Sequence, residues 1–291
     1  MATYGSVGEA ATALRVTPSA VSQQLAKLER ETHSRLVERN GRGIRLTDAA
    51  LLLAEHAADI LARVEHAESD FEAQRDEVVG RLSIAAFSTA ARGLLPQALV
   101  LLADRHPRLT VTLSELEPPE AVRDVARGVV DLAIVQDWHN LPLALPDGIR
   151  RQPLLDDVAD LVAPADHPLA DRAAVDLRRL VDQPWICSPP GAVCHDLLVH
   201  TVRSYDAEPQ IAHVAAEYET QLALVAAGFG LALVPRLGRS AVLPDGVVVR
   251  ETRPVLRRSV YAAWRDRVSR RPAIRVAVDA VSEVAAPDRT A

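Results

Sequence analysis

The chain has 291 residues, of which 48% are hydrophobic, so it can bury a sizeable core and has room for two or three structural units. No stretch approaches about 18 unbroken apolar residues and the start lacks a signal-peptide pattern, which excludes a membrane-spanning helix and favours a cytoplasmic protein. The net charge of −6 is uneven: residues 1–50 carry +2 and the rest −8, as expected if only a basic N-terminal part meets nucleic acid.

Residues 6–29 contain two short amphipathic helical patterns joined by a polar turn, which is typical of a DNA-binding helix-turn-helix. Thr17 is placed to cap the second helix, and Pro18 takes its first position, where a missing N–H costs nothing. An apolar stripe on the second helix is expected to be buried against the first. The residues of this expected contact are Val21, Leu25 and Leu28 on the second helix and Ala10, Ala11 and Leu14 on the first.

The opposite face of the second helix is small and polar, with Ser19, Ser22, Gln23 and Ala26. Short hydroxyl and amide side chains allow a helix to enter the major groove and bond to base edges, so Thr17 and Gln23 are the preferred candidates for base contacts. The alternative is a helical hairpin whose polar face only meets water.

Residues 36–47 form two strand-like runs around Asn40-Gly41, a strong hairpin signal that indicates a wing. Its arginines are expected to bind phosphates, although a solvated basic turn is the alternative. The predicted DNA-binding residues are Thr17, Pro18, Ser19, Ser22, Gln23, Arg39, Arg42 and Arg45.

From Thr47-Asp48 to about Val78 the chain has neither Gly nor Pro and predicts one long helix. Apolar residues follow at four-three spacing, which favours a partner helix and hence a homo-oligomer formed through residues 46–71. The alternative is that this stripe packs on the chain's own body. The stripe is Leu46, Ala50, Leu53, Ala57, Ile60, Val64, Ala67 and Phe71.

After Gly80, strands and helices alternate, which predicts a doubly wound α/β body in two lobes. The first lobe is expected to contain strands at 82–87, 109–116 and 131–135 and helices at 94–106 and 120–127. A Pro-rich connection, 137–148, leads to strands at 149–155 and 158–163. The second lobe is expected to contain strands at 185–188, 210–216 and 231–234 and helices at 194–205 and 219–227. Residues 261–264 and the helical tail from Pro272 return to the first lobe.

The expected domains are therefore a winged helix-turn-helix over 1–47, a linker and dimerisation helix over 48–79, and a ligand-binding body over 80–291. Lobe I comprises about 80–160 and 258–291, and lobe II about 161–257.

Small ligands of such lobes bind where strands end beside helix N-termini. The residues at these positions are expected to line one cleft, although each alone could be an ordinary cap or turn residue. They are Ser88, Thr89, Glu117, Gln136, Ser188, Pro189 and Glu217.

The chain resembles the LysR-type transcriptional regulators along nearly its whole length. The matching runs are Gly5-Ser6-Val7, Val16-Thr17-Pro18-Ser19-Ala20-Val21-Ser22-Gln23-Gln24, Leu36-Val37-Glu38-Arg39, His106-Pro107, Asp131-Leu132-Ala133-Ile134, His167-Pro168-Leu169 and Ala227-Gly228-Phe229-Gly230. The resemblance implies an N-terminal winged helix-turn-helix, a long linker helix and a two-lobed, periplasmic-binding-protein-like α/β effector domain. It further implies a dimer or tetramer that binds an inverted repeat in promoter DNA and responds to a small metabolite, with no cofactor.

By position, the resemblance implies that Thr17, Ser22 and Gln23 contact bases and that Ser88, Glu117, Ser188 and Glu217 lie near the effector. One departure is that only four residues precede Gly5, where the family has a helix of about fifteen. Val7 and Leu14 are then expected to lose cover. The two alternatives are that the true start of the chain lies upstream of Met1 or that DNA binding by this chain is impaired.

Other function classes have less support. An enzyme or metal site is not indicated, because no nucleophile-base pair, phosphate loop or metal-ligand spacing occurs. A solute-binding protein would fit the body but not the N-terminal motif. A thiol sensor is a third alternative: Cys194 lies near a helix start, which would stabilise a thiolate, whereas Cys187 lies in an apolar strand.

Overall fold

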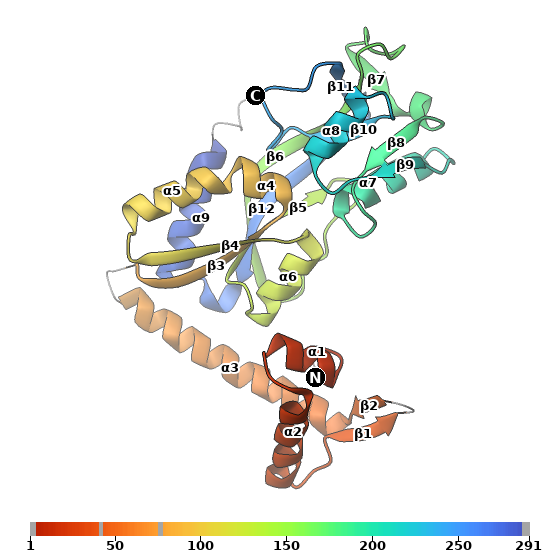
Figure 1. The fold of residues 1–291 in the computed structure, drawn as a ribbon. Helices are drawn as coiled ribbons and strands as arrows, with labels where there is room; N and C mark the ends of the chain where they lie inside the picture. Colours follow the sequence, from red (N-terminus) through yellow and green to blue (C-terminus); the bar gives the residue numbers. More distant parts are fainter. Residues whose placement is uncertain (1–3, 41–42, 75–77, 287–291) are drawn as a thin grey trace. The chain divides into compact units, whose positions relative to one another are not determined.

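The computed structural model describes residues 4–40, 43–74 and 78–286. The chain forms two compact units, Met1–Phe71 and Glu72–Ala291. In the first, helix α1 (Val7–Ala13) and helix α2 (Pro18–Thr32) are joined by a short turn (Figure 1). The predicted start of α2 is confirmed, because Thr17 Oγ1 accepts a hydrogen bond from Ala20 N at 3.2 Å and Pro18 is the first helical residue.

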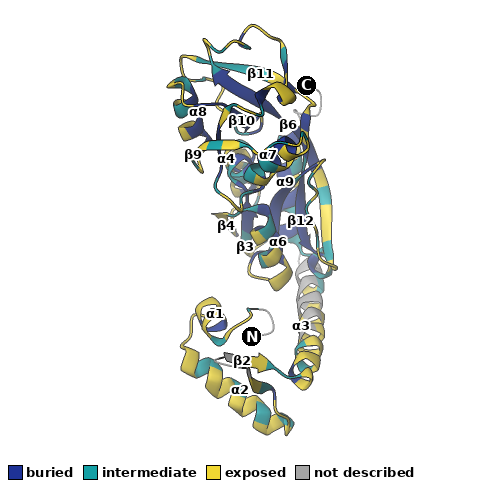
Figure 2. Ribbon diagram, turned by 90° about the vertical axis from the view of Figure 1, so that its right-hand side faces the viewer, coloured by how far each residue is buried: buried dark blue, intermediate teal, exposed yellow. Residues whose placement is uncertain are grey.

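The predicted burial of the α2 stripe is wrong. Ala10 and Ala11 of α1 are buried, but α2 has no buried residue, and Leu28 is 39% exposed. Figure 2 shows α2 as mostly exposed. The physical reason is that α1 has only seven residues, of which Ala10 and Ala11 are buried, so it covers too little of a fifteen-residue neighbour. The expected exposure of Leu14 is observed, at 60%.

The predicted wing is an antiparallel pair of strands, β1 (Val37–Asn40) and β2 (Gly43–Leu46), with Glu38 opposite Arg45. Helix α3 (Asp48–Gln74) follows directly, and Thr47 Oγ1 accepts a hydrogen bond from Ala50 N at its start. Along the predicted heptad stripe, Ala50 is buried, whereas Ile60 and Phe71 are more than 60% exposed. The distal half of the stripe is therefore an exposed apolar face.

The second unit is built on one large sheet. Among the described residues, strands pair in the order β4-β3-β5-β12-β6-β11-β7, with β10 also on β6, while β8 and β9 form a separate pair. The strands are β3 (Gly80–Ala86), β4 (Leu109–Glu115), β5 (Leu132–Trp138), β6 (Ile149–Pro164), β7 (Ala174–Asp176), β8 (Pro184–Cys187), β9 (Gln210–Val214), β10 (Ala232–Pro235), β11 (Val247–Arg253) and β12 (Leu256–Arg265). The helices are α4 (Ser88–Gly93), α5 (Leu95–Arg105), α6 (Pro118–Arg127), α7 (Val193–Arg203), α8 (Tyr218–Ala226) and α9 (Pro272–Ala285).

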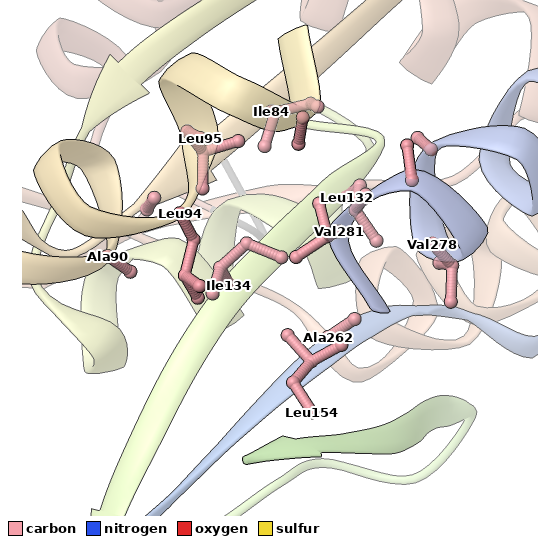
Figure 3. Close-up of a cluster of buried hydrophobic side chains, with 14 of the residues drawn as sticks. Ile84, Ala90, Leu94, Leu95, Leu132, Ile134, Leu154, Ala262, Val278 and Val281 are labelled. Atoms are coloured by element: carbon pink, nitrogen blue, oxygen red, sulfur yellow. The ribbon is translucent and has the colours of Figure 1, made fainter. Parts of the chain in front are cut away.

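In lobe I, formed by β3 to β5 with α4 to α6 and α9, both faces of the sheet are covered. Ile84 and Ile134 pack under α5 and α9 (Figure 3), while the neighbouring Ala85 and Val135 pack under α6. Helix α9 returns to lobe I as predicted. Burial on both faces explains why β5 and the second half of β3 are continuous apolar runs in the sequence, whereas the edge strand β4 is mostly exposed and alternates with polar residues.

Lobe II contains β7 to β11, α7 and α8, and strands β6 and β12 extend into it from lobe I. The prediction of two strands at 149–155 and 158–163 is wrong, because β6 is one strand of 16 residues. The pair Asp156-Asp157 resembles an interruption in the sequence, but Asp157 is buried within the strand and paired with Arg258 of β12. Strand β12 is also longer than the predicted 261–264.

Candidate DNA-binding face and effector cavity

The polar face of α2 is open in the first unit. Thr17, Pro18, Ser19, Ser22 and Gln23 are all exposed. Two hydroxyls are partly engaged, because Thr17 Oγ1 caps the helix and Ser22 Oγ donates to Pro18 O at 3.0 Å. Within the described part of the chain, the Gln23 amide has no hydrogen-bond partner, so both its donor and acceptor groups face solvent.

The wing arginines differ from one another. Arg39 is exposed, whereas Arg45 donates from Nε and Nη2 to Glu38 Oε1 at 3.0 and 2.5 Å. This exposed pair neutralises part of the positive charge that was predicted for phosphate binding. Arg42 lies outside the described residues.

Glu29 connects α2 to the wing. Its Oε1 accepts hydrogen bonds from Leu36 N at 2.7 Å and Val37 N at 3.2 Å. These two backbone donors, with a smaller contribution from Arg35, hold the pKa of the Glu29 carboxyl below its ordinary value. The carboxylate thus fixes the position of β1 relative to the end of the predicted reading helix.

A cavity of about 470 Å³ lies in the second unit, lined from both lobes. We call it the effector cavity. Six of the seven residues predicted for the effector line it: Ser88, Thr89, Glu117, Gln136, Ser188 and Pro189. Glu217 does not; it is exposed just before α8, and its neighbour Tyr218 lines the cavity instead.

The sequence prediction missed Arg258, which is fully buried in the cavity lining. Its guanidinium donates to Asp157 Oδ2 from Nε at 2.9 Å and from Nη2 at 2.6 Å. It also donates to Thr89 Oγ1 at 2.9 Å and to Gln136 Oε1, both on lobe I. A signal existed, because Arg258 lies between the buried Leu256 and Val260 at a spacing of two, where an inward-facing strand position is expected to be apolar.

Glu117 joins the two lobes across the cavity. Its Oε2 accepts a hydrogen bond from Val193 N, the first residue of α7, at 3.2 Å. Burial is the main cause that raises the pKa of Glu117 above its ordinary value, and the nearby carboxylates of Glu115, Asp196 and Glu120 act in the same direction.

Both cysteines are free thiols; Cys187 is buried, and Cys194 is half-buried in the cavity lining. Cys194 is the second residue of α7, and Tyr218 Oη donates to its Sγ at 2.9 Å. Burial raises the pKa of Cys194 above its ordinary value, which opposes the predicted stabilisation of a thiolate by the helix start, while Arg258 and Tyr218 act in the other direction. Burial also raises the pKa of Cys187 to about 11.

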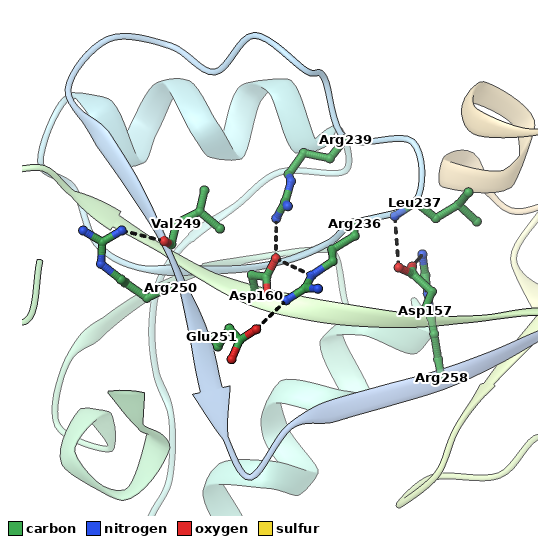
Figure 4. Close-up of polar contacts among 9 residues, drawn as sticks. All are labelled: Asp157, Asp160, Arg236, Leu237, Arg239, Val249, Arg250, Glu251 and Arg258. Atoms are coloured by element: carbon green, nitrogen blue, oxygen red, sulfur yellow. Dashed lines mark hydrogen bonds and ion pairs between the residues drawn. The ribbon is translucent and has the colours of Figure 1, made fainter. Parts of the chain in front are cut away.

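A larger, more open cavity of about 1610 Å³ lies elsewhere on the second unit. Most of its arginines already have acidic partners: Arg92 pairs with Glu219, and Arg236 and Arg239 pair with the buried Asp160 (Figure 4). Asp157, which binds Arg258, also accepts a hydrogen bond from Leu237 N at 3.1 Å and lines this cavity. The predicted effector residues do not gather here.

No group of three or more His, Cys, Asp or Glu side chains in residues 4–40, 43–74 and 78–286 could hold a metal ion. No helix within those ranges is long and apolar enough to cross a membrane.

Comparisons with known proteins agree along the chain. Residues 1–51 match the bacterial regulatory helix-turn-helix protein, lysR family, and residues 75–286 match the LysR substrate binding domain. A probable RuBisCO transcriptional regulator of Chlorokybus atmophyticus is 29% identical over 206 residues, which cover 71% of this chain and 65%, just under two thirds, of that protein. The HTH-type transcriptional activator IlvY of Salmonella typhimurium is 29% identical over 231 residues, covering 79% of this chain and 77% of IlvY.

Among solved structures, a cysteine-to-aspartate variant of full-length OxyR from Pseudomonas aeruginosa has a TM-score of 0.69 at 25% identity, covering 98% of this chain and 93% of that chain. The domain match over 75–286 alone spans more than half of the chain, and the N-terminal match adds the DNA-binding motif. The chain therefore belongs to the LysR family of transcriptional regulators.

Proposed function

We propose that a small molecule bound in the effector cavity controls how this LysR-family regulator binds promoter DNA. The observation that carries the proposal is that the cavity is lined from both lobes, by Thr89 and Gln136 of lobe I and by Ser188 and Tyr218 of lobe II. A ligand that contacts both lobes changes the free-energy difference between their open and closed arrangements, and that difference is what a regulator must transmit.

DNA binding is assigned to the α2 face and the wing, with Thr17, Ser19, Ser22 and Gln23 toward bases and Arg39 toward phosphates. The exposed apolar face of α3 supports a homo-oligomer, because a second copy of the helix would cover it. Two heads related by a two-fold axis can then occupy two half-sites of an inverted repeat. We infer no catalytic role and a cytoplasmic location. The thiol-sensing alternative has less support, because burial raises the pKa of Cys194.

Filling the cavity tests the effector part of the proposal. Ser88→Trp places a large side chain in the effector cavity, and Ser240→Trp, the matched control, places one in the larger cavity. A metabolite library is screened by the shift in melting temperature of the full chain. Hits are expected to stabilise the wild type and Ser240→Trp but not Ser88→Trp. They are also expected to change the affinity of the wild type for DNA from upstream of its own gene. Loss of the hits in Ser240→Trp alone would place the effector in the larger cavity and overturn the proposal.

Gln23→Ala tests the DNA-binding part. Because the amide faces solvent on the reading face, its loss is expected to weaken specific binding by about 1–3 kcal/mol and to leave binding to random-sequence DNA nearly unchanged. Fluorescence anisotropy with both DNAs at several salt concentrations measures the two affinities. Equal weakening on both DNAs would show that Gln23 does not contact bases.

A further inference from the structure

The strongest anion-binding groups of the effector cavity are already engaged within the protein. Four of the hydrogen bonds that the buried Arg258 guanidinium donates go to Asp157, Thr89 and Gln136, and Asp157 neutralises its charge. The backbone N–H at the start of α7 is donated to Glu117. An anionic ligand would therefore have to displace an internal partner in order to gain either group.

The lining also contains three carboxylates, those of Glu115, Glu117 and Glu120. Glu117 is half-buried in the cavity wall, and Glu115 and Glu120 lie exposed at its rim. The other cation of the lining is Arg123, which is exposed on α6. With Arg258 neutralised, the wall carries more negative than positive charge on the side of lobe I.

Glu117 is the acidic group that a bound molecule would meet inside the cavity. Within the described residues, the hydrogen bond to its carboxylate comes from the uncharged Val193 N–H, and burial and the neighbouring carboxylates raise its pKa. A cation placed beside it would compensate its negative charge, whereas a second carboxylate would add repulsion in a partly desolvated site.

We propose that the effector of this regulator carries a positively charged nitrogen, as in a small primary amine or guanidine, and that Glu117 is the residue that selects it. The inference rests on the proposed function, because it assigns a chemical class to the ligand of the same cavity. The volume of about 470 Å³ lies within the usual range for a small-molecule site, so an ordinary metabolite fits.

The test sorts a metabolite library by charge at neutral pH and measures the dissociation constants of its hits for the full chain by calorimetry. Amines and guanidines are expected among the hits, and Glu117→Gln, which keeps the hydrogen bond from Val193 N, is expected to weaken them about tenfold or more. Glu217→Gln is the matched control, since Glu217 lies outside the cavity lining, and is expected to leave them unchanged. Hits that are only carboxylates, a library without any amine hit, or amine affinities equal in wild type and Glu117→Gln would each overturn the inference.

A second measurement does not depend on the variant's folding. N-acetylation of an amine hit removes its charge and keeps most of its shape, and it is expected to weaken wild-type binding about tenfold or more. Equal affinity of the two forms would overturn the inference. The outcomes also separate the two proposals: anionic hits that are lost in Ser88→Trp would leave the proposed function intact and refute the charge class, whereas hits unaffected by Ser88→Trp would refute the cavity itself.

Discussion

At the scale of single residues, the second unit contains a buried ion pair between Arg258 and Asp157. It lies where strands β12 and β6 cross from one lobe to the other, and its two ends contact different surroundings. Arg258 reaches Thr89 and Gln136 in the effector cavity, while Asp157 accepts the Leu237 backbone N–H. The aromatic rings of Phe87 and Trp138 lie 5.2 and 5.3 Å from the guanidinium carbon. The site therefore depends on a charge that is tolerated only because it is fully partnered.

Arg258→Met is expected to destabilise the chain by about 3–5 kcal/mol, because the buried Asp157 carboxylate would lose its counter-ion. Chemical denaturation followed by tryptophan fluorescence measures the free energy of unfolding. The matched control is Arg257→Met, since Arg257 is the exposed neighbour on the same strand, and a change within about 0.5 kcal/mol is expected there. Similar losses for both variants would contradict a special role for the pair.

At the scale of elements, the N-terminal unit is held together by caps and side-chain bridges more than by a core. Thr17 caps α2, and Glu29 ties the end of α2 to the first wing strand, whereas α2 has no buried residue. In such a unit polar contacts determine how the reading helix and the wing are placed relative to each other. The acid dependence of that placement follows from Glu29.

Because the folded-state pKa of Glu29 is lowered, its carboxylate stabilises the folded unit above the unfolded pKa of about 4.3, and this contribution disappears as the pH falls through the folded value. Glu29→Gln is expected to lower the melting temperature at pH 7. The difference in melting temperature between this variant and the wild type is expected to become smaller as the pH falls below about 4. Glu31→Gln is a control on the exposed side of the same helix. Melting curves by circular dichroism between pH 3 and 7 would decide, and a pH-independent difference would refute the linkage.

At the scale of the whole second unit, close backbone contact couples the lobes. Gly238, in the segment after β10, packs against α4 of lobe I: a Cβ built on it would lie 2.4 Å from Thr89 O, and its φ is +69°. The same segment is held to β6 by the ion pairs of Arg236 and Arg239 with Asp160 (Figure 4). Thr89 lines the effector cavity, so this contact lies directly behind the proposed ligand site.

Gly238→Ala is expected to destabilise the chain by roughly 2–4 kcal/mol and to weaken effector binding, because the clash is with backbone and the φ is unfavourable. Gly246→Ala separates the two causes: its φ is +85°, but the nearest atom would be 3.6 Å away, so only the conformational cost of about 1–2 kcal/mol is expected. Denaturation curves of both variants measure the difference. Equal losses would show that the lobe contact contributes nothing.

Features that depend on a few neighbouring residues could be predicted from the sequence alone. The cap at Thr17, the proline after it, the wing strands and the start of α3 were all predictable, because capping and turn chemistry act within one helical turn or hairpin. The alternation of strands and helices placed six of the seven predicted residues on one cavity, since strand ends of a wound sheet converge on one edge.

Which charges are buried and which helix starts face the cavity depends on contacts between residues far apart in the sequence, so neither could be predicted from local patterns. Arg258 and Asp157 are 101 residues apart, so the sequence suggested a break at Asp156-Asp157 where β6 continues. The cavity lies on the side of Tyr218 and not of Glu217, because the direction in which α8 begins is set by its packing on β6 and β8. Burial of α2 was likewise overestimated, because an apolar stripe can be buried only where a large enough surface covers it, and amphipathic spacing alone does not supply one.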